Sequence, residues 1–379
     1  MLSKLEFENL ELSDYNHNSL YLTGSINSKL LSLNNASDWS EYLSRLPEEM
    51  QDIYYSPEYY NIWEKNGAGK AYCFIFEDGN NIAVYPFLLN RINDLGYELD
   101  KPYFDIQGAY GYNGVVYSSD HPGFRKKFYI AFSKFCIYNN IIAEFTRFHP
   151  LIGNHKFSED FIDVIFDRKS VHIDLKQKYD DIVKNYTRSA RQNLRTAAAN
   201  DLNILVSKDV FPYKKEFTKI YKETMDRVKA EKYFYFSDNY FDDTFKIPSL
   251  IQFMVFSNKV PIASALCIGK KNYLHVHLLA SKTDFLFNRP NNFLINKIIQ
   301  YGIGKGFNEL NLEGGRSSAA DDSLLRFKKN FSKMTCNFYI GKKIYNRDVY
   351  QSVIYQWKKN YPEMVDKHFN KILKYRYFE

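Results

Sequence analysis

The sequence predicts a mixed α/β protein with two domains of similar size. The chain has 379 residues, more than the roughly 100 to 200 of one ordinary domain. Short apolar runs typical of strands alternate with segments whose apolar residues have helical spacing. The second half repeats the order of the first, without a residue-level repeat. We therefore expect one domain over residues 1–165 and another over residues 166–379, the second ending in a helical tail.

The first half is interpreted as one unit of strands and helices. Ser56 and Pro57 suit the N-cap and the first position of a helix. Gly79-Asn80 separates two apolar runs, which indicates a hairpin. In chain order we expect a helix, two hairpin strands, a strand with a glycine- and tyrosine-rich loop, a helix, and a strand with a turn, at residues 56–65, 71–78, 81–92, 104–117, 124–141 and 141–154.

The second half follows a similar order. Turn signals at Asn258-Lys259 and at residues 270–272 divide residues 250–281 into three strands. In chain order we expect a strand, two helices, the three strands, a helix and a last strand, at residues 170–175, 181–201, 213–234, 250–281, 289–307 and 309–313.

The composition is that of a globular protein in a reducing compartment. Apolar residues make up 45% of the chain and charged residues 25%. No segment approaches the roughly 18 uninterrupted apolar residues of a membrane span. The N-terminus carries acids where a secretory signal needs a cationic start, so we expect a cytoplasmic protein. The formal net charge of +7 favours anionic partners such as phosphates, without pointing to nucleic acid.

The four cysteines are expected to be buried free thiols. They lie far apart among apolar or aromatic neighbours, at Cys73, Cys136, Cys267 and Cys336. Without a CxxC pair, structural zinc is not expected. None has a setting that argues for a covalent acyl-enzyme intermediate.

Two helices of the second half are candidates for binding anions. The helix from Asn291 can be capped by Asn291 or Asn292, and its free backbone N–H groups could hold a pyrophosphate, with Arg289 adding charge. An ordinary capped helix has the same features. The other helix carries Lys184, Arg188, Arg191 and Arg195 on one face. This face could contact nucleotide phosphates or a tRNA acceptor stem, or it could simply be solvated.

Two strands carry candidate proton acceptors. His275 and His277 alternate onto one face of a strand, and either imidazole could act as a general base or be an ordinary hydrogen-bonded strand residue. Gly314 and Gly315 would let the backbone pass close to a ligand, which leaves Glu313 and Arg316 at the end of the last strand. A plain exit from strand to loop is the alternative interpretation.

Several segments together resemble the FemAB-like proteins, members of the GNAT superfamily with two tandem acetyltransferase-type domains. They occur in the expected order over about residues 55–335, and they read SPEYY, FDIQGAYGYNGVV, AEFTRFHPLIGN, NYTRSARQNLRTAAA, YKETMDRVKAEKYFYFS, RPNNFLINKII and LNLEGGRSSAADDSLLRFKKNFS. The resemblance implies two GNAT-like domains, each with a mixed, largely antiparallel sheet flanked by helices. It also implies transfer of an acyl or aminoacyl group to an amine on a cell-envelope precursor or sugar.

The resemblance leaves the acyl donor open. Some members resemble peptidoglycan bridge enzymes that use aminoacyl-tRNA, and others resemble acyl-CoA-dependent N-acyltransferases, some of which modify nucleotide-linked amino sugars. The tRNA-using enzymes often carry a long helical hairpin arm, whereas residues 213–234 offer one helix without a partner. In the GNAT pattern, the proton acceptor, the donor to the oxyanion and the coenzyme A site fall on the strand at 273–280, the helix after it and the strand at 309–313.

The first half would contribute the acceptor side of the site. A loop of glycine and tyrosine, with Tyr110 and Tyr112, can stack on a sugar or base. Asp105 and His149 are candidate acceptors for the proton of the sugar amine if they face a cleft. Arg147 could bind a phosphate or pair with Asp105.

We therefore expect an N-acyltransferase that moves an acyl group from acyl-CoA to a dTDP- or UDP-linked amino sugar for surface polysaccharides such as O-antigen and lipopolysaccharide. No metal is expected. The alternatives are an aminoacyl-tRNA-dependent transferase acting on a peptidoglycan precursor, and a non-catalytic protein that binds a glycan or nucleotide. The candidate residues are, for catalysis, His149, Asp105, His277 and Glu313; for coenzyme A, Arg289, Asn291, Asn292, Phe293 and Leu279; and for the acceptor, Tyr110, Tyr112, Arg147, Arg188 and Arg316.

Overall fold

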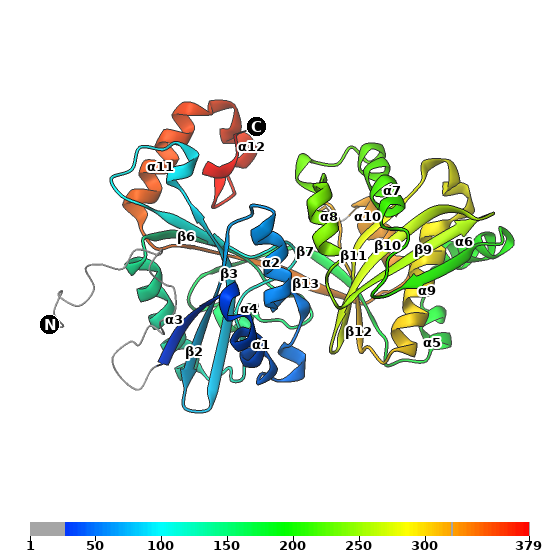
Figure 1. Ribbon diagram of the computed structural model, residues 1–379, viewed down its shortest axis with the longest axis horizontal. Helices are drawn as coiled ribbons and strands as arrows, with labels where there is room; N and C mark the ends of the chain where they lie inside the picture. The colour runs from blue at the N-terminus through cyan, green and yellow to red at the C-terminus, as the bar shows by residue number, and fades with distance from the viewer. Residues whose placement is uncertain (1–26, 320, 379) are drawn as a thin grey trace.

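The computed structural model describes residues 27–319 and 321–378, and it shows a mixed α/β fold with one large sheet flanked by helices (Figure 1). The strand order is β1-β2-β3-β4-β6-β13-β7-β12-β11-β10-β9-β8, with β5 paired to β3. The predicted fold class is thus confirmed, although the strands of both halves are joined in a single sheet.

The first half contains the predicted hairpin, β2 and β3, which turns at Gly79 with φ of +60°. The predicted cap of α2 is also present, because the Ser56 side chain accepts the N–H of Tyr59 and Pro57 begins the helix. The elements are β1 (Asn27–Ser32), α1 (Ala36–Ser44), the 3₁₀ turn η4 (Ile53–Tyr55), α2 (Pro57–Lys65), β2 (Lys70–Asp78), β3 (Asn81–Arg91), β4 (Phe104–Gln107), β5 (Val116–Tyr117), α3 (Pro122–Tyr138), β6 (Ile141–Arg147) and α4 (His155–Ser158).

The second half contains the three predicted antiparallel strands, β9, β10 and β11, joined by turns with positive φ at Asn258, Lys259 and Lys271. The elements up to the last loop are β7 (Asp163–Asp174), α5 (Tyr179–Lys184), α6 (Arg188–Ala199), β8 (Asn203–Ser207), α7 (Lys214–Arg227), η6 (Lys232–Phe234), α8 (Asp238–Thr244), β9 (Leu250–Ser257), β10 (Val260–Lys270), β11 (Tyr273–Ser281), η7 (Thr283–Asn288), α9 (Pro290–Gly304), β12 (Glu309–Gly314) and α10 (Ser323–Lys329).

Two predicted helices differ from the structure. The helix expected over residues 181–201 is interrupted after Lys184, and Thr187 starts α6 by accepting the N–H of Ala190. The helix expected over residues 213–234 ends at Arg227 and is followed by η6 and the short α8. Phe217 of α7 contacts Phe241 of α8, so within residues 27–319 these helices pack together and do not form a long projecting arm.

The same arrangement occurs once in each half. β4 pairs in parallel with β6 across the segment that contains α3, and β11 pairs in parallel with β12 across the segment that contains α9. The other named strand pairs are antiparallel. The two halves therefore share one topology, as the repeated order of predicted elements suggested.

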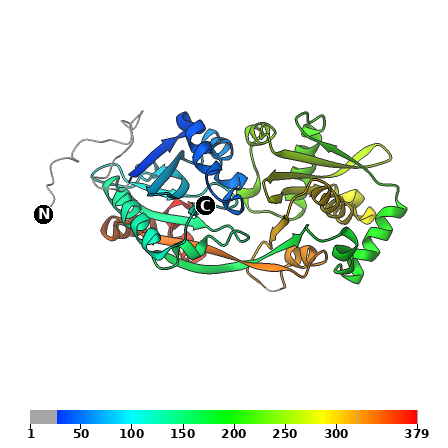
Figure 2. The same ribbon diagram turned by 90° about the horizontal axis from the view of Figure 1, so that it is seen from below.

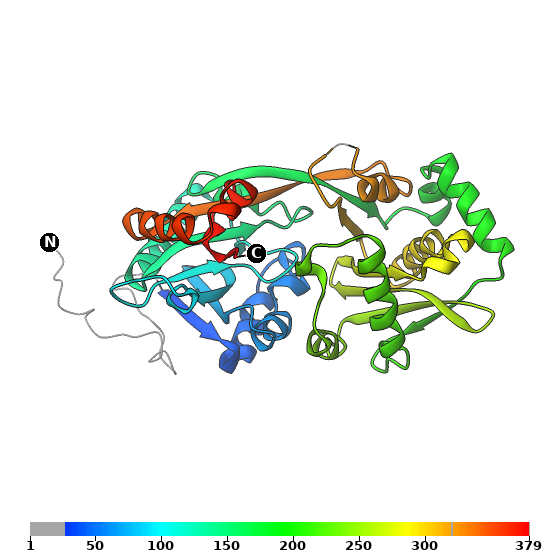
Figure 3. The same cartoon turned by 90° about the horizontal axis from the view of Figure 1, so that it is seen from above.

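Two long strands connect the halves. β7 pairs with β12 of the second half and with β13 (Thr335–Ile344), which in turn pairs with β6 of the first half. Figures 2 and 3 show these two strands running between the halves. A hydrophobic cluster also crosses the boundary, since Tyr54 and Trp63 of the first half belong to the same core as Tyr240 and Leu278 of the second.

The C-terminal segment lies on the first half, although the sequence analysis placed it in the second domain. It forms α11 (Arg347–Asn360) and α12 (Val365–His368), which lie beside β6 in Figure 1. The buried Trp357 of α11 shares a core cluster with Ile92, Tyr97 and Ile142 of the first half. Within residues 27–319 and 321–378, none of the helices is long and apolar enough to cross a lipid bilayer.

Candidate active site

The candidate active site lies where β11 and β12 separate. The pairing of these parallel strands ends at His275 and Asn311, whereas β11 continues to Ser281 and β12 to Gly314. A cavity of about 190 Å³ opens beside the separated ends. Its walls come from β11, β12, α7, α10 and the tyrosine-rich loop of the first half, and they include Tyr110, Tyr221, His277, Leu279, Glu313 and Lys328. A ligand can therefore reach strand edges that are not paired with each other.

Glu313 and Lys328 place opposite charges on this cavity. Burial raises the pKa of Glu313 above its ordinary value, although Lys328 and His275 oppose the shift. Burial lowers the pKa of Lys328 to about 8, and here Glu313 opposes the shift. The Nζ of Lys328 donates a hydrogen bond to the carbonyl oxygen of Gly314 at 2.8 Å. A carboxylate with a raised pKa can accept a proton near neutral pH, and the lysine can stabilise developing negative charge.

The two glycines after Glu313 accommodate protein atoms. A Cβ atom at Gly314 would lie 2.9 Å from the Lys169 carbonyl oxygen, and one at Gly315 would lie 2.4 Å from the Asp322 carboxylate. That carboxylate caps α10 by accepting the N–H of Leu325, and it also accepts the N–H of Arg316. The close approach that we expected for a ligand is thus made by β7 and by the cap of α10.

The start of α9 offers polar groups to an anionic ligand. The Nδ2 atom of Asn292 has no hydrogen-bond partner in the described part of the chain, although the residue is only 5% exposed. The Oδ1 atom of Asn288, before the helix, is also buried without a partner there. Asn291 donates to the Ser281 hydroxyl at 3.2 Å. Because buried polar atoms are normally paired, the Asn292 N–H groups and the first N–H groups of a 15-residue helix fit a pyrophosphate, whereas Asn288 Oδ1 is an acceptor and would not contact it.

The other residues expected around coenzyme A lie near the same helix. Arg289 is exposed and takes a left-handed conformation with φ of +57° directly before α9. Phe293 is half-buried, with the Lys297 ammonium group 5.5 Å from the centre of its ring. Leu279 lines the cavity.

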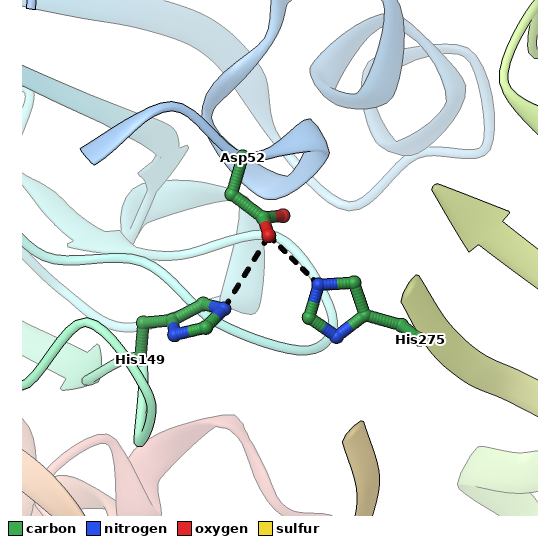
Figure 4. Close-up of side chains that lie close together, drawn as sticks. All are labelled: Asp52, His149 and His275. Atoms are coloured by element: carbon green, nitrogen blue, oxygen red, sulfur yellow. Dashed lines mark hydrogen bonds and ion pairs between the residues drawn. The ribbon is translucent and has the colours of Figure 1, made fainter. Parts of the chain in front are cut away.

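A buried cluster of Asp52, His149 and His275 lies between the halves (Figure 4). The Oδ2 atom of Asp52 is 2.7 Å from His275 Nε2 and 3.6 Å from His149 Nε2. Burial alone would raise the pKa of Asp52, but the two histidines outweigh it and hold this pKa well below the ordinary range. Asp52 is therefore a buried, charged carboxylate.

The hydrogen bonds in this cluster do not suit a metal ion. His149 Nδ1 accepts the backbone N–H groups of Leu151 and Ile152, so the ring proton is on Nε2, the atom that faces Asp52. A metal ion bound there would need the Nε2 lone pair and would leave Nδ1 as a donor facing two other donors. His275 has the same tautomer, because its Nδ1 atom faces the Asn311 amide nitrogen.

The structure separates the four expected catalytic residues. Glu313 and His277 line the cavity, where Tyr240 contacts His277 Nε2 at 2.8 Å and burial lowers the pKa of His277 to about 3. His149 belongs to the buried cluster, and burial lowers its pKa too. Asp105 lies under the C-terminal tail, where Arg376 and Tyr375 donate to its Oδ2 atom at 2.7 and 2.8 Å.

The acceptor residues also separate. Tyr110 lines the cavity and stacks on Trp63 at 5.6 Å, whereas the buried Tyr112 hydroxyl receives a hydrogen bond from Asn311. Arg147 holds the tyrosine-rich loop through the carbonyl oxygens of Gly108 and Ala109. Arg188 and Arg316 are exposed. Asp52 and Lys328 are the residues of this region that the sequence analysis did not select, and His275 was considered there only as an alternative to His277.

The Asp105 pair predicts a stability effect. Replacing Arg376 with alanine should cost about 3 kcal/mol at neutral pH, because a buried carboxylate would lose its cation. Burial raises the pKa of Asp105 above its ordinary value, so its charged form already opposes folding. Without Arg376 the pKa of Asp105 in the folded protein rises further. The variant should therefore lose stability as pH rises from the pKa of Asp105 in the unfolded chain to its higher pKa in the folded protein. Urea unfolding at pH 5 and pH 8 tests this; Arg347→Ala, an exposed arginine of α11, should change stability by less than about 0.5 kcal/mol.

The fold is similar to that of FemX. The crystal structure of FemX superposes with a TM-score of 0.65 at 11% sequence identity, covering 88% of this chain and 99% of that one. The sequence matches no family model and no curated protein. At this identity the likeness establishes the fold, which is the one that the FemAB-like resemblance implied.

Two further solved structures share this fold. One is the C-terminal domain of a protein assigned as a lysylphosphatidylglycerol synthetase from Agrobacterium fabrum, with a TM-score of 0.52, 13% identity, and 84% and 92% of the two chains covered. The other is a conserved protein of unknown function from Bacteroides thetaiotaomicron, with a TM-score of 0.54, 8% identity, and 82% and 97% covered.

Proposed function

We propose that the protein is an N-acyltransferase in which a neutral amine attacks an activated acyl group in the cavity between β11 and β12. The observation that supports this most directly is the placement of Glu313 and Lys328 on the cavity where the two parallel strands separate. Acyl transfer to an amine needs a proton acceptor and a donor for the oxyanion, and this cavity supplies one residue for each.

Each residue has one task in the proposed reaction. The amine nitrogen forms a bond with the carbonyl carbon of a thioester, and the carbon–sulfur bond then breaks to release a thiolate, which takes a proton from solvent. Glu313 accepts the proton that the amine loses. Lys328 uses one of its three N–H groups on Gly314, which leaves two for the oxyanion of the tetrahedral intermediate. The Asp52 cluster does not line the cavity and makes no contact with the substrate in this scheme.

The proposed donor is acyl-CoA. The unpaired Asn292 amide and the first N–H groups of α9 would bind its pyrophosphate, and Leu279 would contact the pantetheine arm. The proposed acceptor is the amine of a nucleotide-linked amino sugar, which would stack on Tyr110 at the edge of the cavity.

A second candidate is aminoacyl transfer from tRNA. The likeness to FemX favours it, as does the exposed arginine face of α6, where Arg188 and Arg195 have no ion-pair partner within residues 27–319 and 321–378. RNA binding through this face should weaken steeply with salt, and binding that is independent of salt would eliminate this candidate.

The deciding experiment is release of free thiol from a panel of acyl-CoA donors, each mixed with dTDP- and UDP-linked amino sugars. Thiol release with one pair, together with the acylated sugar in a mass spectrum, would support the proposal. A folded protein that releases no thiol with any pair would contradict acyl-CoA as donor. Ligand binding without turnover under any condition would favour a non-catalytic binding protein.

The donor site predicts the effect of one substitution. Asn292→Leu should raise the KM for acyl-CoA about tenfold, because one charge-assisted hydrogen bond to phosphate is worth about 1.5 kcal/mol or more. The kcat at saturating donor should change little. Asn200→Leu, at the C-terminal end of α6, is the control and should leave the KM unchanged. An Asn292 variant with wild-type KM would argue against pyrophosphate at the start of α9.

A further inference from the structure

Glu313 has a backbone conformation that side chains rarely adopt. Its φ is +64°, in the left-handed region, although it has a Cβ atom and is followed by two glycines that do not have positive φ. β12 carries a one-residue bulge here, since Asn311 pairs with His172 of β7 while Glu313 pairs with the adjacent Val171. Contacts with neighbouring residues must stabilise this conformation, because the backbone of Glu313 would otherwise relax to a more favourable φ.

The side chain of Asn311 makes the contact that spans the bulge. Its Oδ1 atom accepts the backbone N–H of Glu313 at 2.8 Å and the hydroxyl of Ser170 at 3.2 Å. Its Nδ2 atom donates to His275 Nδ1 at 3.2 Å and to the Tyr112 hydroxyl at 3.1 Å. Asn311 is fully buried, and both its amide oxygen and its amide nitrogen make hydrogen bonds within the protein. These four contacts determine the orientation of the amide.

The Asp52 cluster determines which way this amide points. Asp52 is charged and lies 2.7 Å from His275 Nε2, which therefore carries the ring proton and leaves the lone pair on Nδ1. Only an N–H group of Asn311 can face that lone pair, so its oxygen faces Glu313. The order of contacts runs from Asp52 through His275 and Asn311 to the backbone of Glu313, and it crosses from the first half to the second.

We propose that Asn311 is a positioning residue, oriented by the Asp52–His275 pair, that holds Glu313 in the left-handed conformation in which its carboxylate lines the cavity. The claim rests on the proposed function where it concerns turnover, and on geometry alone where it concerns the conformation of Glu313. It gives the first half a role in catalysis without contact with the reacting atoms.

A double-mutant cycle tests the effect on turnover. With the acyl-CoA and amino-sugar pair that releases thiol, Asn311→Ala should lower kcat about a hundredfold, the range of a misplaced catalytic group, and leave the KM for acyl-CoA within about threefold. In the Glu313→Gln background the same substitution should lower kcat by less than about threefold. Equal losses in both backgrounds would overturn the proposal, because a general structural defect would act in both. Asn337→Ala, on β13, is the matched control and should leave kcat unchanged in either background.

Two conservative variants make the cycle more specific. Asn311→Asp keeps an oxygen for the N–H of Glu313 but places a second oxygen opposite His275 Nδ1, so it should lower kcat by less than Asn311→Ala does. If Asn311→Ala does not fold, His275→Gln is used in the cycle instead. This variant removes the ring nitrogen that accepts the Asn311 N–H, and it should lower kcat only when Glu313 is present. An aspartate variant as impaired as the alanine variant would overturn the proposal.

A crystal structure of Asn311→Ala tests the geometry without any substrate. We expect Glu313 to leave the left-handed region and its carboxylate to leave the cavity wall. A φ that stays near +64° in the variant would overturn the proposal, whatever the reaction is. If Glu313→Gln alone leaves the rate unchanged, the assigned role of Glu313 fails, while this structure still decides the role of Asn311.

Discussion

Replacing Glu313 with glutamine should lower the rate of amine acylation by about a hundredfold to ten-thousandfold, the range that a positioned general base contributes. Glutamine keeps the size and polarity of the side chain but cannot accept the proton of the amine. Because burial raises the pKa of Glu313, the wild-type rate should increase as pH rises through that raised value. The rate should fall again above the pKa of Lys328, about 8, where the lysine loses its charge. In Glu313→Gln the increase at low pH should disappear.

A second glutamate on the same strand provides the control for this prediction. Glu309 of β12 contacts His172 at 2.8 Å and does not line the cavity. Glu309→Gln should therefore retain the wild-type rate and both limbs of the pH profile, measured by thiol release at saturating donor. If Glu313→Gln keeps the low-pH limb, another group accepts the proton, and His277 would be tested next.

Local rules predicted most of the fold. Ser56-Pro57, Gly79 and the turn at Asn258 act on their immediate neighbours, so the helix and hairpins that they define appear at the expected residues. The break at Thr187 was missed because the cap operates through a single hydroxyl, and a threonine with this role looks the same in the sequence as one inside a helix. The position of the C-terminal helices was missed for another reason. Helical periodicity shows that α11 has an apolar face, but it does not show which half covers that face.

The candidate site could be predicted only where one strand or helix carries it. Glu313, His277 and Asn292 were selected from their positions at the end of a strand, on a strand and at the start of a helix. Asp52 had no such signal, because its partner His275 lies 223 residues away in the other half. Lys328 was not selected either, since the burial of its ammonium group depends on how α10 packs. The left-handed conformation of Glu313 depends on tertiary contacts that glutamate alone does not encode.

Asp52 should contribute more to stability than any surface acid of the chain. Its carboxylate accepts the N–H of Tyr54, contacts His275 and faces His149, all without exposure to solvent. Removing one member of such a buried pair leaves the other polar groups without a partner and without water. In an alanine variant the ring N–H of His275 and the backbone N–H of Tyr54 would lose their acceptor, and His149 would lose the carboxylate that it faces at 3.6 Å.

We therefore expect Asp52→Ala to lower the free energy of unfolding by about 3 to 5 kcal/mol, measured by urea denaturation at pH 7. Asp242→Ala, which removes a surface ion pair with Lys214, is the control and should cost less than about 1 kcal/mol. The pH dependence follows from two pKa values. Burial already lowers the pKa of His149, and Asp52 opposes that shift. Without Asp52 the pKa of His149 therefore falls further, and folding becomes less favourable below about pH 6.5, the pKa of histidine in the unfolded chain.

The pKa of Asp52 acts in the opposite sense at lower pH. It is held below its ordinary value in the folded protein, so its contribution is complete above the unfolded value of about 3.9 and is lost as pH falls below it. The difference in stability between wild type and Asp52→Ala should thus increase from pH 8 to pH 5 and decrease below pH 4. A difference that does not change with pH, or one no larger than that of Asp242→Ala, would mean that Asp52 is not a charged partner of the two histidines.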